Sequence, residues 1–350
     1  MEYKPDLDNV IKRYQAFWQK DLHDHPPIRV RYPIPGQSDE EWCQAFQAPE
    51  TYFDYHENIL KHRVDLHDDA LPTAAIDMAP GMWGGIMGCE VRFGHGTSWS
   101  KHELTDWNDM DRFLDMRADE SNPWVRRMLD LVEYFTEKSA GKCLVGMPLP
   151  MGPGDMVTAL RGPTEICLDI YLNPEQLQVM LEACTKLWIE FFQLMFDRIP
   201  SYQGGYADDY DIWTPGRTSY FADDVTSIIS DQSYLDTFFK HDCKVADSLE
   251  TPWMHIHSEQ ARLIPEFVKI PGLRGIQVVN DFPAGPSLKS IVPQLKQVQK
   301  EHCLILRKYT IEELEEILGD LSPEGLLIDS HCDSKEQAKV TLQKWIERVW

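Results

Sequence analysis

Residues 251–280 read TPWMHIHSEQARLIPEFVKIPGLRGIQVVN, and the pattern of this stretch decides the fold class. An apolar run at 253–257 is followed by a longer amphipathic segment and then by a second apolar run at 275–279. Short apolar runs that alternate with longer amphipathic segments are typical of β/α units around a parallel sheet. The stretch therefore predicts an α/β protein.

The same alternation extends over the whole chain of 350 residues. The eight runs that we expect to form strands are 28–32, 73–77, 143–146, 204–206, 253–257, 275–279, 303–306 and 325–329. We expect five helices between them. One begins after Asn173, which acts as its N-cap, and another begins at the capping box of Thr310. The other three span residues 233–249, 287–300 and 334–349. This order predicts a (β/α)8 TIM barrel, formed by a single domain over residues 1–350 with an N-terminal helical elaboration over residues 1–70.

Acidic residues dominate the charge of the chain, with 57 Asp and Glu against 34 Lys and Arg and a formal net charge of −23. A surface of this sign repels phosphate backbones and anionic lipids, so neither nucleic acid nor a membrane is expected as a partner. No apolar run approaches the roughly 20 residues of a membrane helix, and the polar N-terminus lacks the apolar core of a signal peptide. The eight cysteines are scattered, which predicts reduced thiols. We therefore expect a cytoplasmic protein with a small-molecule substrate.

Two of the predicted strands carry metal-binding residue types at their ends. His255 and His257 lie one residue apart, so strand alternation places both on the same face, and the last predicted strand runs into His331 and Cys332. In TIM barrels the reactive groups gather at the carboxyl ends of the strands, so we expect these residues to share one pocket. Two imidazoles and the Cys332 thiolate, with an open fourth position, are typical of catalytic zinc. The alternative is a pair of hydrogen-bonded core histidines and an ordinary buried thiol.

Two acidic clusters lie between the third and fifth predicted strands. In the first cluster, Asp208-Asp209-Tyr210-Asp211, we expect Asp208 and Asp209 to belong to a solvated acidic loop. Asp223 and Asp224 are flanked by apolar residues, where an ionisable group needs a partner or a function. Because crowded carboxylates raise one another's pKa, this second pair is a candidate for acid/base chemistry or for binding a cation.

Several segments, taken in order along the chain, resemble the uroporphyrinogen decarboxylase superfamily. These segments are 27–31, 75–77, 146–162, 222–235 and 328–332. True decarboxylases of this superfamily bind a porphyrin precursor through an N-terminal R-Q-A-G-R motif, of which only Arg31 remains here. Corrinoid-linked methyltransferases of the same superfamily bind zinc through an H-x-C motif and a C-terminal cysteine, which match His255, His257 and Cys332. The resemblance thus implies a zinc-dependent enzyme that moves a methyl group between a small substrate, or a thiol or pterin acceptor, and a corrinoid protein.

The resemblance also suggests roles for residues outside the zinc site. The catalytic candidates are Asp77, Asp223, Asp224 and His331, and the candidates for substrate binding are Arg31, Trp83, Tyr206, Tyr210, Trp213 and Arg217. The aromatic members of this set could hold a quaternary amine by cation–π attraction, with ordinary packing as the alternative. Whether His331 or Cys332 occupies the functional position stays open.

Two other functions fit the sequence. The first is a cofactor-independent decarboxylase, in which Asp77, Asp223 and His331 act as acids and bases. Its substrate carboxylates would be anchored by arginines, for which the candidates are Arg31, Arg161 and Arg217. The second is a non-catalytic binding protein on a degenerate barrel, suggested by the missing arginine motif.

Overall fold

Strands alternating with helices build the described part of the chain, residues 1–21, 24–348 and 350, in a computed structural model. Every one of the eight predicted runs overlaps a strand. These strands are β1 (Ile28–Arg31), β2 (Thr73–Ala75), β5 (Leu144–Gly146), β6 (Gly205–Ala207), β9 (Trp253–His257), β10 (Gly275–Val279), β11 (Cys303–Tyr309) and β12 (Leu326–His331). The chain adds the short strands β3 (Val91–Gly94), β4 (Thr97–Ser100), β7 (Trp213–Pro215) and β8 (Tyr220–Phe221). The predicted α/β class is confirmed.

The strands outside the β3–β4 hairpin form two sheets. The larger sheet is parallel in the order β1-β12-β11-β10-β9-β8, and the smaller runs β2-β5-β6-β7 with only β7 antiparallel to its neighbour. Where β1 of the larger sheet lies next to the segment before β2 of the smaller sheet, the Asp69 N–H donates to the carbonyl of Ile28 at 2.8 Å. Among the described residues no strand ladder connects the two sheets. Because β2, β5 and β6 offer only three residues each, their ladders are short, and the closed barrel stays a prediction.

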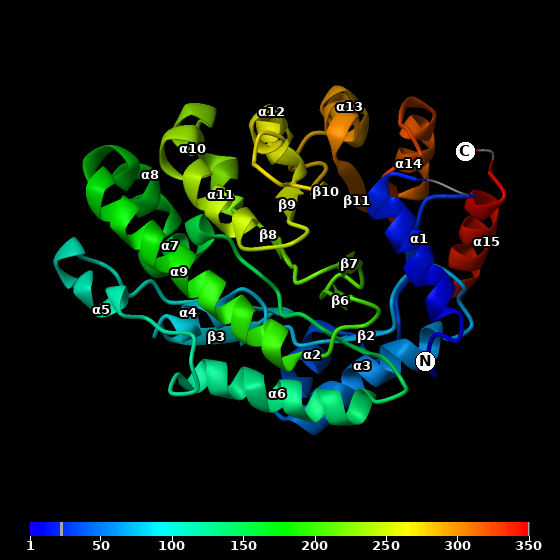
Figure 1. The fold of residues 1–350 in the computed structure, drawn as a ribbon, viewed down its shortest axis with the longest axis horizontal. Coiled ribbons are helices and arrows are strands. Elements are labelled where there is room, and N and C mark those ends of the chain that lie inside the picture. The colour runs from blue at the N-terminus through cyan, green and yellow to red at the C-terminus, as the bar shows by residue number, and fades with distance from the viewer. Residues whose placement is uncertain (22–23, 349) are drawn as a thin grey trace.

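Helices lie outside the strands, and α8, α10, α12, α13 and α14 follow one another around one side in chain order (Figure 1). The helices are α1 (Leu7–Gln19), α2 (Asp39–Ala45), α3 (Pro49–Arg63), α4 (Gly81–Ile86), α5 (Asp111–Leu114), α6 (Pro123–Ser139), α7 (Pro153–Arg161), α8 (Pro163–Leu172), α9 (Pro174–Arg198), α10 (Asp231–Thr237), α11 (Phe239–Asp247), α12 (Ile264–Phe267), α13 (Val292–Glu301), α14 (Ile311–Ile317) and α15 (Lys335–Ile346). Short 3-10 turns separate several of them, including 224–228 after β8.

Two helices begin where the sequence signals predict. Thr310 Oγ1 accepts the Glu313 N–H at 3.2 Å, and the Glu313 carboxylate accepts the Thr310 N–H at 2.9 Å, so the predicted capping box of α14 is confirmed. Helix α9 begins after Asn173, but the Asn173 amide donates to a carboxylate of α8 instead of capping. The predicted helix 233–249 is divided into α10 and α11. Val349, the predicted end of the last helix, lies outside the described residues.

Helix α1 covers the amino ends of the strands in the larger sheet. Its apolar side chains form one buried cluster with Trp253 at the start of β9 and Cys303 at the start of β11. Trp18 of α1 also donates from Nε1 to the carbonyl of Trp213 at 2.8 Å. Large apolar side chains therefore fill this end of the sheet, and the polar strand ends lie at the other.

The main core lies between the strands and the helices outside them. Helix α9 contributes Trp188, Phe191 and Phe192, which are buried, and the rings of Trp188 and Phe192 pack with centroids 4.2 Å apart. Among the described residues, no helix combines the length and the apolar composition that crossing a bilayer requires.

Candidate metal centre and active site

A cavity of about 610 Å³ opens at the carboxyl ends of β8, β9, β10 and β11. Asp224, His255, His257, Asp281 and Arg307 form its polar wall. Strand β4 and the loop before α7 form much of the opposite wall. Because the carboxyl ends of parallel strands meet at one edge of a sheet, side chains from separate β/α units converge here.

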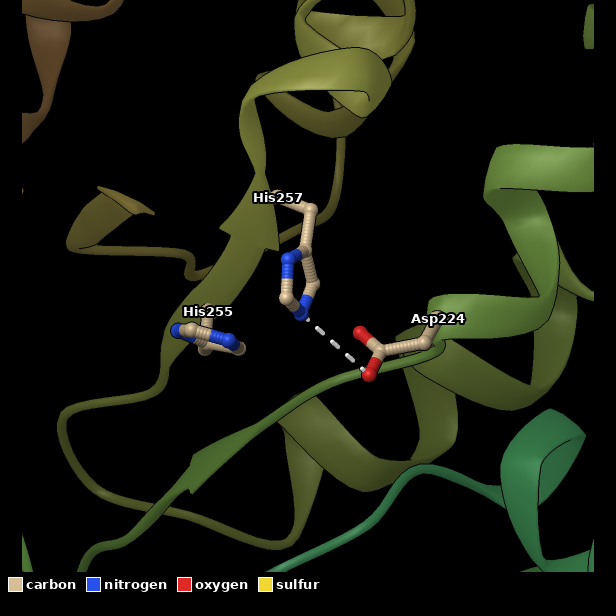
Figure 2. Close-up of side chains that lie close together, drawn as sticks. All are labelled: Asp224, His255 and His257. Atoms are coloured by element: carbon tan, nitrogen blue, oxygen red, sulfur yellow. Dashed lines mark ion pairs between the residues drawn. The ribbon is translucent and has the colours of Figure 1, made fainter. Parts of the chain in front are cut away.

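Asp224, His255 and His257 form a cluster of possible metal ligands in this cavity. Each offers one ligand atom, and these atoms all lie within 4.8 Å of one another. Figure 2 shows His257 pointing toward Asp224, with 3.5 Å between Nε2 and Oδ2. The rings of His255 and His257 have centroids 5.2 Å apart. Both histidines line the cavity, as alternation along β9 predicts.

The Nδ1 atom of each histidine is held by an acceptor on the neighbouring strand or just after it. His255 Nδ1 lies 2.6 Å from Gln277 Oε1, and His257 Nδ1 lies 2.9 Å from Asp281 Oδ1. The other oxygen of Asp281 accepts the Ser258 N–H at 3.0 Å, which orients the carboxylate. Metal-binding histidines typically donate one ring N–H to such an acceptor, because this leaves the other nitrogen free for the metal. Both Nε2 atoms are therefore available to the cluster.

The charges of the three groups are set by burial and by one another. Burial lowers the pKa of His255 to about 4. The hydrogen bond with Asp224 raises the pKa of His257 to about 9 against the opposing effect of burial. Burial raises the pKa of Asp224, but the hydrogen bond from His257 is among the effects that outweigh it and lower that pKa. The cluster thus combines a neutral imidazole with an imidazolium–carboxylate pair, whose proton a metal cation would replace.

Asp223, a predicted catalytic residue, does not line this cavity. It is fully buried, and its Oδ1 accepts the Asp155 N–H at 3.1 Å. Burial and the neighbouring Asp242 raise the pKa of Asp223 well above its usual range, and burial raises the pKa of Asp242 to about 7. Within the part of the chain that the structure describes, Asp223 Oδ2 and Asp242 Oδ1 are buried without a hydrogen-bond partner, and the raised pKa of both groups indicates that the two carboxyls share a proton inside the fold, behind the cavity wall.

Asp242→Asn is expected to stabilise the fold at alkaline pH. The folded state keeps a proton that the unfolded chain loses near pH 4, so this pair makes the protein less stable as the pH rises from about 4 toward 7. An amide at position 242 cannot ionise, so we expect the variant to exceed the wild type by about 1–3 kcal/mol at pH 8 and to match it near pH 4. Urea unfolding at both pH values measures the difference. If Asp242→Asn is less stable than the wild type at pH 8, the two carboxyls do not share a proton in the folded state.

Cys332 is not part of the metal cluster, contrary to the prediction. It follows β12, which lies three strand spacings from β9 in the larger sheet, at about 4.8 Å each. Cys332 is buried, and burial raises the pKa of its thiol. Together with His331 it lines a separate cavity of about 560 Å³. The strand order is the one that the predicted barrel implies, but Cys332 lines a different cavity from the one that His255 and His257 line.

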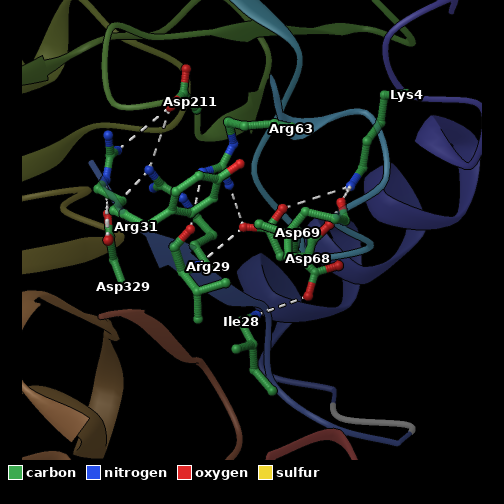
Figure 3. Close-up of polar contacts among 12 residues, drawn as sticks. Lys4, Ile28, Arg29, Arg31, Arg63, Asp68, Asp69, Asp211 and Asp329 are labelled. Carbon is green, nitrogen blue, oxygen red and sulfur yellow. Dashed lines mark hydrogen bonds and ion pairs between the residues drawn. The ribbon is translucent and has the colours of Figure 1, made fainter. Parts of the chain in front are cut away.

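Arg31, a predicted substrate anchor, belongs to an ion-pair network at the ends of β1 and β12 (Figure 3). Its Nε lies 3.0 Å from Asp329 Oδ2, and Arg29 Nη2 lies 3.1 Å from the same oxygen. Both guanidinium groups also approach Asp211, at 3.5 and 3.8 Å. Burial raises the pKa of Asp329, but Arg31 and Arg29 outweigh it and hold that pKa far below its usual range. Carboxylates of the fold therefore already neutralise Arg31.

Of the predicted aromatic wall, only Tyr210 lines the main cavity. Trp83 is fully buried and donates from Nε1 to a loop carbonyl at 3.1 Å. Trp213 is buried beneath α1 at the opposite end of the strands, and the Tyr206 hydroxyl donates to a carbonyl of α9 at 3.1 Å. Arg217 pairs with an exposed carboxylate of α9, outside the cavity. Ordinary packing therefore accounts for Trp83, Tyr206 and Trp213.

The acid/base set of the decarboxylase alternative is not brought together. Asp77 lies after β2, where its Oδ1 accepts the Ala79 N–H at 2.7 Å, and it does not line the main cavity. Asp223 is buried behind the cavity wall, and His331 lines the second cavity. Arg161, a predicted carboxylate anchor, is paired through Nε with a buried carboxylate of α8 at 2.7 Å. Asp77, Asp223 and Arg161 thus have structural partners, and together with His331 they do not converge on one site.

Asp208 and Asp209 do not belong to a solvated loop, contrary to the prediction. Asp208 is buried, and its Oδ1 accepts the N–H groups of Tyr210 and Ile212 at 2.8 and 3.0 Å. Asp209 accepts the hydroxyl proton of Tyr220 at 3.0 Å. These bonds fold the β6–β7 turn inward and place Tyr210 against the cavity.

Among solved structures, the fold is similar to a methyltransferase from Methanosarcina mazei. The two structures superpose with a TM-score of 0.66 over 97% of this chain and 98% of that chain, at 14% sequence identity. No protein-family model matches the chain, and no curated protein matches it. At this identity the likeness establishes the fold over nearly the whole length of both chains.

Five polar residues around the cluster were not anticipated from the sequence. They are Asp155, Gln277, Asp281, Arg307 and Lys308. Gln277 interrupts the apolar run 275–279 and Asp281 follows it. Polar residues in or just after a predicted strand are candidates for the site, so the same reasoning applied to this run would have found both. Asp155 carries no such signal: its two oxygens accept the N–H groups of Asp224 and Val225, at 2.8 and 2.9 Å, from a distant segment.

Proposed function

We propose that this protein is a zinc-dependent methyltransferase that moves a methyl group between a small substrate, or a thiol or pterin acceptor, and a corrinoid held by a partner protein. The observation that carries the proposal is the cluster of Asp224, His255 and His257 facing a cavity of about 610 Å³. The fold similarity to a methyltransferase supports it, as does the sequence resemblance to the corrinoid-linked branch.

The donor set fits zinc. Two imidazole nitrogens and a carboxylate oxygen with an open fourth position form a known type of catalytic zinc site. With Asp224 in place of the predicted Cys332 as third ligand, the preference for a soft metal is weaker, and other divalent first-row ions also suit the site. The experiment that tests the proposal therefore compares the binding of zinc with the binding of these other ions.

The residues around the cluster have defined roles in this proposal. Zinc, when bound, supplies Lewis-acid chemistry that lowers the pKa of an acceptor thiol or polarises the leaving atom of a methyl donor. Gln277 and Asp281 orient the two rings through their Nδ1 atoms. Asp155 holds the backbone of Asp224 through its N–H, and Tyr210 forms part of the apolar wall that limits access of water.

Metal content and methyl transfer test the proposal together. Untagged protein, stripped with a chelator and reloaded, is expected to bind one zinc ion per chain in preference to cobalt or manganese. The loaded protein is then mixed with methylcobalamin and a small thiol. In the expected reaction a carbon–sulfur bond forms as the cobalt–carbon bond breaks, cobalt keeps the electron pair, and the thiol loses its proton to solvent. Spectra of methylcobalamin measure the rate, and protein that neither binds zinc nor accelerates transfer contradicts the proposal.

Asp281→Asn is expected to lower the zinc affinity by about 10–100-fold, because the residue that orients a metal-bound histidine is worth about that much. The Asp281 carboxylate accepts from His257 Nδ1 at 2.9 Å, and an amide oxygen would be a weaker acceptor. A competition titration with a fluorescent chelator measures the change. Glu259→Gln, at an exposed position of the following turn, is the matched control and should leave the affinity unchanged. Equal affinities of Asp281→Asn and wild type would remove Asp281 from the site.

A further inference from the structure

Arg307 and Lys308 bring two positive charges to the cavity that holds the candidate metal ligands. Within the described residues, neither side chain forms an ion pair, and Arg307 Nε is buried without a hydrogen-bond partner. The Arg307 guanidinium lies 4.0 Å from the ring centroid of Tyr210, which holds it beside the cavity. Arg29 and Arg31, by contrast, are neutralised by carboxylates. In a chain with a net charge of −23, a half-buried arginine at the cavity that forms no ion pair within 4.0 Å among the described residues requires a reason, and the exposed Lys308 beside it adds a second positive charge.

The backbone of β11 aims both cations at the cavity. In a regular strand, neighbouring residues point to opposite faces. Here Arg307 pairs with Asp329 and Tyr309 pairs with Ser330, so Lys308 is an extra residue in the strand. Its φ of 63° is left-handed, which a residue other than glycine seldom adopts without a functional or structural cause. A bulge of this kind redirects side chains, and both residues consequently line the cavity.

The same arrangement opposes a cationic substrate. A quaternary amine needs free aromatic faces. The Arg307 guanidinium lies over one side of the Tyr210 ring, and Tyr220 stacks on that ring with centroids 4.7 Å apart and planes at 15°. A substrate cation in this cavity would also be repelled by Arg307 and Lys308.

We propose that Arg307 and Lys308 form a subsite for an oxyanion group of the substrate, such as a carboxylate or a phosphonate. Arginine offers a planar pair of donors to such a group, and lysine adds a mobile point charge. The oxyanion would occupy one end of the substrate, and the other end would extend toward Asp224, His255 and His257. For the methyl transfer at that second end, the inference rests on the proposed function. The anion subsite itself needs no metal.

Calorimetric titration of chelator-treated protein with methylphosphonate tests this subsite without metal. Wild-type protein is expected to bind methylphosphonate and not tetramethylammonium. Arg307→Leu and Lys308→Asn should each weaken binding at least tenfold, since asparagine tolerates the left-handed backbone at 308. Arg307→Lys keeps the charge and should fall between wild type and Arg307→Leu. Lys289→Asn removes an exposed lysine outside the cavity and should bind as the wild type does.

Several outcomes would overturn the subsite. Full affinity in Arg307→Leu would place the anion elsewhere, and binding of tetramethylammonium in place of methylphosphonate would reverse the sign of the site. If Arg307→Leu does not fold, as judged by circular dichroism, Arg307→Lys and Lys308→Asn decide. Zinc titration of the same proteins separates the two proposals. Zinc binding without methylphosphonate binding refutes the subsite alone, and methylphosphonate binding without zinc binding refutes the proposed function alone.

Discussion

Replacing His255 with alanine is expected to lower the zinc affinity by more than about 100-fold, the upper range for loss of an outer-shell partner, because a direct ligand contributes more. His255 is buried, and its neutral ring presents Nε2 to the cluster while Gln277 holds Nδ1 at 2.6 Å. With alanine at this position, His257 and Asp224 remain as ligands, and two protein ligands hold zinc weakly. Competition with a chromophoric chelator measures the affinity.

His102→Ala is the matched control for this experiment. His102 lines the same cavity but lies outside the cluster, where its Nδ1 contacts the Ala159 carbonyl at 3.1 Å. Its replacement should leave zinc binding unchanged. Cys332→Ala should also bind zinc as the wild type does, because Cys332 lines the second cavity. Loss of zinc in Cys332→Ala with full binding in His255→Ala would restore the thiolate site and refute the cluster.

Asp329→Asn is expected to destabilise the fold by about 3–5 kcal/mol, the usual cost of removing one partner of a buried ion pair. Asp329 is fully buried, and two guanidinium groups approach its Oδ2, from Arg29 at 3.1 Å and Arg31 at 3.0 Å. The amide would leave both cations with Asp211 alone, at 3.5 Å or more. Urea unfolding measures the free energy, and Asp197→Asn is the control. That substitution breaks the exposed pair with Arg217 and should cost less than about 1 kcal/mol.

The contribution of Asp329 should depend on pH. The two arginines hold its pKa below the unfolded value, so its contribution is present above an unfolded pKa of about 4 and is lost as the pH falls below it. The difference between wild type and Asp329→Asn should therefore shrink on acidification. A difference that stays constant from pH 7 to pH 3, or that equals the effect of Asp197→Asn, would show that the ion pair does not stabilise the fold.

The fold could be predicted from the sequence because its signals are local. Each of the eight apolar runs overlaps a strand, and the capping box of Thr310 begins a helix. Apolar burial and backbone capping act within a few residues, so they leave a readable pattern. The connection between the two sheets is not local, and Asp69 and Ile28, which meet at the join, are far apart in the chain.

The candidate site was predictable only in part. Alternation along one strand placed His255 and His257 on one face, and the apolar flanks of Asp224 marked it as a candidate cation ligand. The order of β9 to β12 is the one that the predicted barrel implies, but the sequence does not show which cavity the Cys332 side chain lines, so Cys332 was assigned to a site that it does not reach. The prediction of a solvated loop for Asp208 and Asp209 was also wrong, because the backbone N–H groups that bind Asp208 come close to it only when the turn is folded.

The sequence by itself determined that this is an α/β protein with histidines of β9 at a strand end, since both follow from periodicities of the chain. Only the tertiary structure decided which carboxylate joins them. It also separated Asp224 from the buried Asp223 and revealed Arg307 and Lys308 beside the cluster. The reason is physical: periodicity places a side chain on a face, whereas ligand sets, ion pairs and burial depend on which strands become neighbours.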